Sequence, residues 1–282
     1  MGAEPLAGTE LARTIREEVA ATCAALAETG GRPRLAVVVA TDDDASAWYV
    51  RSISRAAASV GIDCEIRDLG AAASADRIHE ELRALSAAPD VHAVILQTPL
   101  PDGVDVARAS EAIDPAKDVD GANPVSLGRL TVGLPAFAPA TAEAVVTLLD
   151  AFGIGLAGRH VVVVGRSPVV GRPLAQLLLA RDATVTVCHS RTTELAGHTR
   201  AADVVVAAVG RAGLLTSEHV VPGTVVVDVG TNPTDDGGLV GDVEASTVGP
   251  VVTALSPVPG GVGPVTTALL LRNVGRAAGE RE

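Results

Sequence analysis

A glycine-bearing turn between an apolar run and a leucine-rich segment is the stretch of this chain best suited to chemistry. Residues 161–179 read VVVVGRSPVVGRPLAQLLL. Four consecutive valines followed by glycine predict a strand buried on both faces. Residues 172–179 then have helical composition, with Pro173 acceptable in a first turn. Strand, tight turn and helix N-terminus together predict a phosphate site, because backbone N–H groups and the helix dipole both attract an anion.

The spacing of this turn differs from the usual G-x-G-x-x-G. Gly165 and Gly171 are six residues apart, and Ser167 and Val170 lie between them. A glycine-rich turn alone is weak evidence, since many strand–helix turns carry glycine for geometry only. Taken by itself, this segment leaves ligand binding and a purely structural turn as equal alternatives.

The next predicted strand, 183–188, favours one dinucleotide over another. An NAD-binding fold usually carries an acid at the end of this strand for the ribose 2′-hydroxyl. This chain instead has Ser190 and Arg191, and Arg166 in the preceding turn adds a second cation. A hydroxyl and two cations suit a 2′-phosphate, so these residues favour NADP over NAD. The alternative is a solvated arginine at a strand end.

Composition and charge exclude several classes of partner. The chain has 282 residues and a formal net charge of −12, which argues against binding to nucleic acid or to an anionic membrane. Aromatic residues make up only 1% of it, so the core must consist of Val, Leu, Ile and Ala. Such cores are typical of parallel α/β sheets.

The three cysteines predict a reducing compartment. Cys23, Cys64 and Cys188 are scattered without paired spacing, so we expect no disulfide or zinc framework. His189 follows Cys188, but adjacent strand residues point to opposite faces, and no metal site is predicted. The N-terminus lacks a signal pattern, and no apolar run is long enough to span a bilayer, so the expected location is the cytoplasm.

The periodicity predicts strands and helices in regular alternation. Helices are expected at 6–27, 45–60, 74–87, 142–152, 172–180 and 267–278, with Ser74 and Thr141 as N-caps. Strands are expected at 35–41, 64–69, 91–97, 160–164, 183–188, 203–208 and 223–229. This rhythm predicts an α/β fold with a doubly wound parallel sheet. The run of aspartates at 42–44 is expected to form a loop or helix cap rather than a metal site.

Polar turns follow several of these strands. Gln97 ends one strand, just before two prolines that stop the ladder, and the carboxyl ends of parallel strands usually carry ligand contacts. A second polar cluster covers 114–121, for which a capped structural loop is the alternative. The segment 256–266 holds three prolines and three glycines in its first nine residues, and we expect a fixed loop that closely approaches a flat ligand.

Four motifs together resemble one enzyme family. They are GRSPVVGRP at 165–173, QTPLP at 97–101, KDVDG at 117–121 and PVPGGVGPVT at 257–266. Their order and spacing are similar to those of the bifunctional methylenetetrahydrofolate dehydrogenase/methenyltetrahydrofolate cyclohydrolase (FolD) family, over nearly the whole chain. The resemblance implies an α/β folate-binding catalytic domain of residues 1–140 and 265–282, completed by the C-terminal helix, and a Rossmann-like NADP domain of residues 141–264. It also implies a homodimer, and a folate substrate between the domains.

The resemblance assigns roles to individual residues. It places a folate-stacking tyrosine at Tyr49, and the pterin near Gln97 and Asp120, so these three are the expected catalytic residues. The expected substrate contacts also include Pro99, Pro259, Gly260, Gly261 and Thr266. The expected cofactor contacts are Gly165, Arg166, Ser167, Val170, Gly171, Ser190, Arg191 and Thr231.

One position departs from the family pattern in a way that matters chemically. The family carries Tyr-x-x-x-Lys where this chain has Tyr49 and, one helical turn later, Ile53. The cyclohydrolase reaction hydrates a methenyl carbon and needs proton transfer, which a lysine of lowered pKa can provide and isoleucine cannot. Lys117 is the only lysine in the chain and lies in a different predicted loop.

Hydride transfer needs fewer catalytic side chains than the hydration step does. The hydride leaves the methylene carbon while adjacent nitrogen lone pairs form an amidinium, so no side chain must take a proton, and orientation supplies most of the catalysis. The sequence therefore predicts an NADP-dependent methylenetetrahydrofolate dehydrogenase of one-carbon metabolism with weak or absent cyclohydrolase activity. Two alternatives stay open: an NADP oxidoreductase acting on another cyclic aminal or imine, and a non-catalytic folate- or nucleotide-binding protein.

Overall fold

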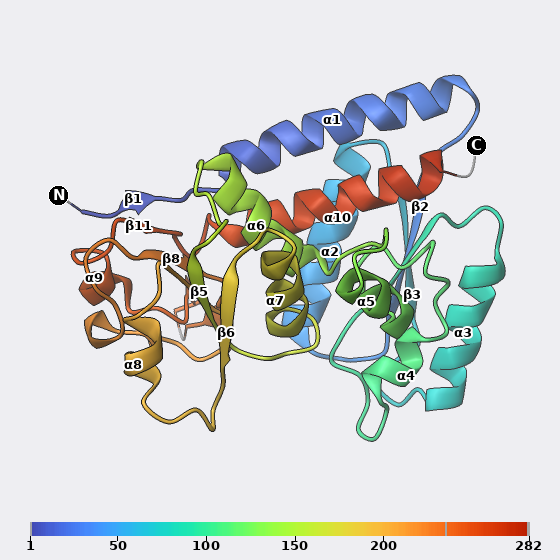
Figure 1. The fold of residues 1–282 in the computed structure, drawn as a ribbon. Helices are drawn as coiled ribbons and strands as arrows, with labels where there is room; N and C mark the ends of the chain where they lie inside the picture. Colours follow the sequence, from blue (N-terminus) through green and yellow to red (C-terminus); the bar gives the residue numbers. More distant parts are fainter. Residues whose placement is uncertain (1, 235, 281–282) are drawn as a thin grey trace. The chain divides into compact units, whose positions relative to one another are not determined.

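The chain forms two α/β units, each built around its own parallel sheet (Figure 1). The computed structural model describes residues 2–234 and 236–280. One unit, here called the nucleotide unit, contains residues 2–12 and Thr141–Thr266, and the other, the first unit, contains Arg13–Ala140 and residues 267–280. The α/β class predicted from the strand–helix rhythm is confirmed.

The division differs from the expected one at the N-terminus. Residues 2–12 group with the nucleotide unit because β1 (Glu4–Pro5) pairs in parallel with β11 (Ala254–Leu255). The backbone of Gly8 also donates to the carbonyl of Gly260, at 2.8 Å. No sequence pattern predicted this short strand, which lies just before the helix expected at 6–27.

The nucleotide unit has a six-stranded parallel sheet. Its remaining strands are β5 (His160–Val164), β6 (Thr184–Cys188), β7 (Val204–Ala207) and β8 (Val225–Asp228), and the order across the sheet is β1-β11-β8-β7-β5-β6. All neighbouring strands are parallel. The central strands β5, β7 and β8 are runs of buried valine, as expected for strands covered on both faces.

Short helices and a hairpin complete this unit. They are α6 (Ala140–Ala151), α7 (Gly171–Leu179), α8 (Leu195–Thr199), the 3₁₀ turn η1 (Ser217–His219), the pair β9 (Asn232–Pro233) and β10 (Leu239–Val240), and α9 (Ala245–Val248). Helix α6 begins at Ala140, so Thr141 lies inside its first turn. The prediction that Thr141 caps this helix is therefore wrong.

The first unit has a three-stranded parallel sheet in the order β3-β2-β4. The strands are β2 (Arg34–Val39), β3 (Asp63–Asp68) and β4 (Ala93–Leu96). The helices that lie wholly or mostly in this unit are α1 (Thr9–Glu28), α2 (Asp44–Ser59), α3 (Ala75–Ala87), α4 (Val106–Ser110), α5 (Pro124–Thr131) and α10 (Val262–Gly279). Helices α1 and α10 run side by side and line a common groove (Figure 1).

Two predicted helix caps are present in this unit. Ser74 accepts a hydrogen bond from the backbone N–H of Arg77 at 3.2 Å, and Asp43 accepts one from Ser46 at 2.7 Å. This bond holds the pKa of the Asp43 carboxyl below its usual value. The aspartate run at 42–44 therefore starts α2 as a cap, because a carboxylate satisfies an amide that the first helical turn leaves unpaired.

Helix α10 begins five residues earlier than predicted. The glycines and prolines of 257–266 indicated a loop throughout, but the helix starts at Val262, and Pro264 lies in its first turn. A proline there loses nothing, because first-turn N–H groups have no partner within the helix. Helices α4, α5, α8 and α9 were also missed, since each has eight or fewer residues and shows little periodicity.

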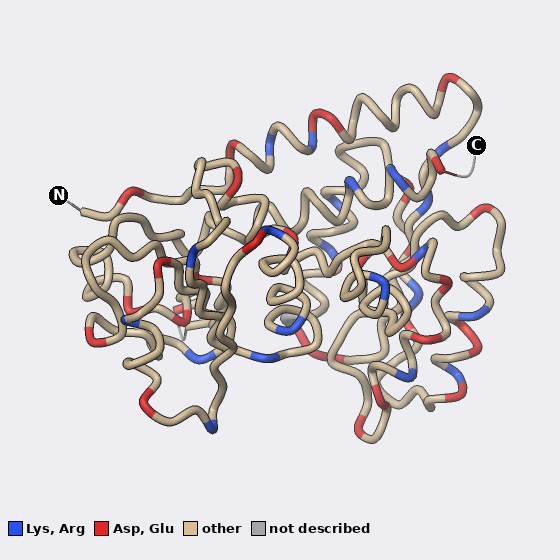
Figure 2. The backbone as a smooth tube through the Cα atoms, viewed as in Figure 1, with Lys and Arg blue, Asp and Glu red and all other residues tan. Residues whose placement is uncertain are grey.

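Acidic and basic residues are spread over both units (Figure 2). Among the described residues, no group of three or more His, Cys, Asp and Glu side chains is arranged to hold a metal ion. No helix in that same part of the chain is long and apolar enough to cross a membrane.

Candidate functional site

The nucleotide sheet has a topological switch point between β5 and β7. These strands are neighbours, but the chain passes from β5 to β6 on one side before it returns to β7 on the other. In open α/β sheets, ligands bind outside the carboxyl ends of the strands at such a point. Gly165 directly follows β5, and Ala208 directly follows β7.

The two glycines of the turn are required by close packing. Gly165 has a φ of +130°, and a Cβ on it would lie 2.1 Å from the carbonyl oxygen of Ala208. A Cβ on Gly171 would lie 2.1 Å from the carbonyl oxygen of Gly165. The glycines therefore do have a geometric role in this turn. They allow the end of β5, the loop after β7 and the start of α7 to pack against one another.

Ser167 organises the start of α7. Its Oγ accepts the backbone N–H of Val170 at 3.1 Å and of Gly171 at 3.4 Å, and its carbonyl accepts the N–H of Arg172 at 3.1 Å. A hydroxyl that accepts in this way still carries a proton to donate. Because these amides already have partners, much of the attraction for a phosphate must come from side chains around the turn.

The predicted 2′-phosphate residues are exposed and carry the required charge. Arg166, Ser190 and Arg191 all reach solvent. The turn after β6 is held by His189, whose N–H donates to Thr192 Oγ1 at 2.8 Å and whose Nδ1 accepts the N–H of Arg191 at 3.1 Å. Within residues 2–234 and 236–280, no carboxylate forms an ion pair with the guanidinium of Arg166 or Arg191.

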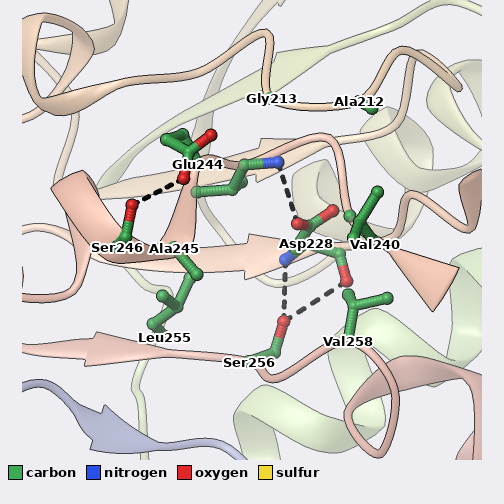
Figure 3. Close-up of a pocket in the computed structure, with 12 residues that line it drawn as sticks. Ala212, Gly213, Asp228, Val240, Glu244, Ala245, Ser246, Leu255, Ser256 and Val258 are labelled. Carbon is green, nitrogen blue, oxygen red and sulfur yellow. Dashed lines mark hydrogen bonds between the residues drawn. The ribbon is translucent and has the colours of Figure 1, made fainter. Parts of the chain in front are cut away.

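Thr231 is exposed in the loop after β8, and Asp228 at the end of that strand shapes the loop. The Asp228 carboxylate accepts N–H groups of Gly230, Asp242 and Val243 at 2.9–3.0 Å. Its backbone N–H donates to Ser256 Oγ at 2.7 Å (Figure 3). Burial raises the pKa of Asp228 to about 6, although these amide bonds oppose the rise.

A pocket of about 310 Å³ opens beside Asp228 (Figure 3). Ser256, Glu244 and Ser246 add polar groups to its lining, and Val258 and Leu255 add apolar surface. The neighbouring Asp242 was missed by sequence reasoning. It lies between a glycine and a valine in an irregular segment, so no periodicity or motif identified it.

In the first unit, α2 places Tyr49 and Ile53 one turn apart. Ile53 is 0% exposed, whereas Tyr49 is only partly buried. Burial raises the pKa of Tyr49 above its usual value, and the negative charge of Asp120 raises it further. Asp120 therefore lies near enough to Tyr49 to act on it, so the structure brings these two predicted residues together.

The loop that carries Asp120 is fixed by buried polar groups. Lys117 is 1% exposed, and its Nζ donates to the carbonyls of Leu85 and Ala88 at the end of α3, at 3.1 and 2.6 Å. Asp118 accepts from Ser126 Oγ at 2.7 Å and from the N–H groups of Ala122 and Asn123. The only lysine of the chain thus has a structural position at a helix C-terminus, where its charge is favourable.

Asp120 has a pKa raised to about 7, first by burial and then by the neighbouring charge of Asp118. Burial also raises the pKa of Asp118 to about 6, against the effect of its hydrogen bonds. Asn273 of α10 steadies the residue between them, because its Nδ2 donates to the carbonyl of Val119 at 3.0 Å. Asp120 can therefore change its charge near neutral pH.

Gln97 and Pro99 follow β4, as predicted. The N–H of Gln97 donates to Val38 on the neighbouring strand, and its side-chain Nε2 donates to the carbonyl of Thr98 at 2.6 Å. The same carbonyl accepts Ser46 Oγ of α2 at 3.2 Å, which joins the start of α2 to this turn. Gln97 is partly buried and Pro99 is exposed.

The remaining predicted substrate residues belong to the nucleotide unit. Gly260 has a φ of +107°, and Gly261 donates its N–H to the carbonyl of Pro257 at 2.8 Å. Pro259 is exposed in this turn, and Thr266 is inside α10, where its hydroxyl donates to the carbonyl of Val262. Gly260 therefore lies in a turn that directly precedes α10.

Comparison with known families matches both parts of the chain. Residues 6–120 match the model described as "Tetrahydrofolate dehydrogenase/cyclohydrolase, catalytic domain", and residues 139–282 match the "NAD(P)-binding domain" of the same family. "Bifunctional protein FolD 1" of Saccharopolyspora erythraea is 64% identical over 277 residues, which cover 98% of this chain and 94% of that protein. "Bifunctional protein FolD" of Nocardia farcinica is 60% identical, with coverages of 97% and 96%.

Solved structures agree with these matches. The FolD dehydrogenase/cyclohydrolase of Campylobacter jejuni has a TM-score of 0.97 at 38% identity, covering 99% of this chain and 100% of that one. The Trypanosoma brucei FolD, solved with NADP cofactor and an inhibitor, has a TM-score of 0.94 at 36% identity, with coverages of 99% and 98%. The predicted Rossmann-like dinucleotide domain and its pyridine dinucleotide cofactor are confirmed.

Proposed function

Because this chain belongs to the tetrahydrofolate dehydrogenase/cyclohydrolase family, as its motifs predict, we propose that it oxidises 5,10-methylenetetrahydrofolate with NADP and hydrolyses the methenyl product weakly or not at all. The family is one of enzymes that carry both activities. In this chain we propose that the dehydrogenase activity is intact and that the cyclohydrolase activity is impaired.

One observation carries this proposal. The position one helical turn after Tyr49 holds Ile53, which is fully buried and has no proton to exchange. Lys117 cannot take its place, because its ammonium is buried and bonded to two carbonyls at the end of α3. Loss of a positioned general acid–base group lowers a rate by about 10²–10⁴-fold.

Asp120 supports weak hydrolysis rather than none. With a pKa of about 7, its carboxyl can release or take a proton near neutral pH. A carboxyl alone lacks the second, basic group that a lysine would supply, so we expect it to catalyse the hydrolysis more slowly than a carboxyl and a lysine together.

The residues for hydride transfer are all present. NADP supplies the hydride acceptor when it is bound. Tyr49 offers a flat surface for stacking on the substrate, while Gln97 and Asp120 offer hydrogen-bonding groups for the pterin. None of these residues must remove a proton for the oxidation, because the nitrogen lone pairs of the substrate expel the hydride. Orientation and exclusion of water are then the main contributions of the protein.

The preference for NADP rests on charge. Arg166 and Arg191 are exposed cations without an ion-pair partner among the described carboxylates, and Ser190 adds a hydroxyl between them in sequence. No acid lies at the end of β6 or in the five residues after it, 189–193, where the ribose 2′-hydroxyl of NAD would need a hydrogen-bond acceptor. These side chains fit a 2′-phosphate, which binds best to charged donors.

Spectrophotometric assays of both half-reactions test the proposal. Methylene oxidation is followed with NADP and NAD side by side, and methenyl hydrolysis is followed after the uncatalysed rate is subtracted. We expect oxidation with NADP and little hydrolysis above background. Hydrolysis as fast as oxidation would refute the loss of the second activity.

Two other functions are separated by the same assays. An NADP oxidoreductase for another cyclic aminal or imine would bind NADP but not turn over the folate. A non-catalytic folate- or nucleotide-binding protein would bind its ligand and transfer no hydride. The altered face around Ile53 is compatible with both, but the family match over both units favours the folate dehydrogenase.

We also propose that the chain is a homodimer in the cytoplasm. The resemblance supports the dimer, and three cysteines without a disulfide support a reducing compartment. Sedimentation of the purified chain tests the dimer, which predicts twice the mass of 28.3 kDa. Cell fractionation tests the location.

A further inference from the structure

A buried carboxylate at the switch point of the nucleotide sheet has no role in the function proposed above. Asp242 is 0% exposed. Its Oδ2 accepts the N–H groups of Val209 and Gly210 at 2.6 and 3.0 Å, and its Oδ1 accepts the N–H of Arg211 at 2.7 Å. Asn232 Nδ2 donates to the same Oδ1 at 3.0 Å.

The residues gathered by Asp242 form the loop after β7. Three successive N–H groups that point to one place make an anion-binding concavity, which is a common phosphate site. Here an internal carboxylate fills that concavity. The loop therefore does not offer these amides to a ligand, and its backbone is held in one conformation.

This loop follows β7 at the switch point, where ligands of open α/β sheets bind, and we therefore take it as one wall of the expected dinucleotide site. Val209 follows Ala208, whose carbonyl oxygen lies only 2.1 Å from the place that a Cβ on Gly165 would take. The dinucleotide turn thus packs directly against the segment that Asp242 holds. A displacement of Val209 and Gly210 would shift the surface that faces the turn.

Asp242 is itself fixed by Asp228. The N–H of Asp242 donates to Asp228 Oδ1 at 3.0 Å, so the loops after β7 and β8 share one hydrogen-bonded network. Two glycines make room for it: a Cβ on Gly230 would lie 2.4 Å from Asp242 Cγ, and one on Gly241 would lie 1.8 Å from Asp228 Oδ2. These distances leave no room for side chains at either position.

We propose that Asp242 is a positioning residue of the dinucleotide site: by accepting the amides of Val209–Arg211, it sets the wall that faces the Gly165 turn. The proposal rests on the function proposed above, since it concerns the same cofactor site. It assigns no contact between Asp242 and the cofactor.

The main test is Asp242→Asn, which keeps the size of the side chain but replaces one acceptor oxygen with a donor. The variant cannot accept all four bonds, so we expect the Kd for NADP to rise about tenfold, with the Kd for tetrahydrofolate within twofold of the native value. Asp203→Asn is the matched control. Asp203 also accepts a backbone N–H, from His160 at 2.8 Å, but at the opposite end of β7. Its Kd for NADP should stay within twofold.

Hydrogen exchange supplies a readout that is independent of activity. The amides of Val209, Gly210 and Arg211 should exchange faster in Asp242→Asn than in Asp203→Asn. If Asp242→Asn does not fold, Asn232→Ala replaces it, because it removes one donor to Asp242. Faster exchange at those three amides, with weaker NADP binding, would support the proposal in that variant.

The failures can be distinguished. A native chain that does not bind NADP would refute the cofactor of the proposed function. A native chain that binds NADP, with a folded Asp242→Asn variant that binds it equally well, would overturn the positioning role. In the replacement variant, unchanged exchange at 209–211 would overturn it too.

Discussion

The dinucleotide turn and the Tyr49–Ile53 face of α2 differ in what defines them. The turn is defined by its backbone geometry, because Gly165 and Gly171 have no space for a Cβ and Ser167 accepts hydrogen bonds from the first amides of α7. The face of α2 is defined by the side chains that it carries. Ile53 is fully buried within a regular helix, at the position where the resemblance leads us to expect a lysine.

This contrast shows why one half of the site can change while the fold is kept. A backbone-defined turn tolerates few residue types, because almost any substitution creates a steric clash. A side-chain-defined face tolerates an apolar replacement that packs well, since packing and not chemistry maintains the helix. The chemical function of such a face can therefore be lost without loss of structure.

Placing an amine at position 53 is the strongest way to sharpen this comparison. We expect Ile53→Lys to raise methenyl hydrolysis by about 10²–10⁴-fold, because it adds a general acid–base group to the face of Tyr49. Burial lowers the pKa of such a lysine and so helps it exchange protons near neutral pH. Hydrolysis is measured by loss of methenyl absorbance.

The matched control is Ile53→Met, which has a similar length and no amine. It should leave hydrolysis at the native rate. An equal rise in the rate of methenyl hydrolysis in both variants would show that the shape of the side chain at position 53, rather than proton transfer, limits the reaction. The proposed chemical role of this face of α2 would then be wrong.

Removing a cation tests the chemistry around the backbone-defined turn. We expect Arg191→Gln to raise the Kd for NADP by about 10- to 100-fold, because a hydrogen bond to a charged group contributes about 1.5–3 kcal/mol. The Kd for NAD should change less than twofold. Arg181→Gln is the control, since Arg181 lies in the same unit but pairs with Asp150 at 2.9 Å. Equal weakening of NADP and NAD would argue against a 2′-phosphate contact.

Adding one methyl group tests the steric requirement of the turn. Gly171→Ala should lower the free energy of unfolding by roughly 1–3 kcal/mol, because its Cβ would overlap the carbonyl oxygen of Gly165. Gly155→Ala is the control, since no atom lies within 4 Å of a Cβ there. Urea unfolding measures both. A Gly171→Ala variant as stable as the control would show that the turn relaxes easily.

The smallest expected effect is a pH dependence of stability. Asp120 has a folded pKa of about 7, above its value of 3.8 in the unfolded chain, so the folded chain binds more protons between these values. Its contribution is present at low pH and is lost as the pH rises towards 7. From pH 5 to pH 8 we expect the free energy of unfolding of the native chain to fall by about 1–2 kcal/mol more than that of Asp120→Asn. This figure allows for the partial exposure of Asp120. Thermal unfolding at the two pH values measures this, and identical slopes would contradict it.

Local patterns predicted the parts of the fold that depend on neighbours in sequence. The valine runs gave β5, β7 and β8, and Ser74 gave the N-cap of α3, because burial of a strand and capping of a helix act within a few residues. The short strand β1 was not predictable in this way. Its two residues are a strand only because β11, about 250 residues later, lies beside them.

The same division applies to the candidate site. The sequence alone determined which residue types are available: two glycines six residues apart, arginines at 166 and 191, and one lysine in a chain that has Ile53 four residues after Tyr49. Tertiary structure decided that Lys117 is bonded at a helix end, that Asp120 has a pKa near 7, and that Asp242 gathers the amides after β7. These properties depend on burial and on partners distant in sequence, and for that reason no local pattern contains them.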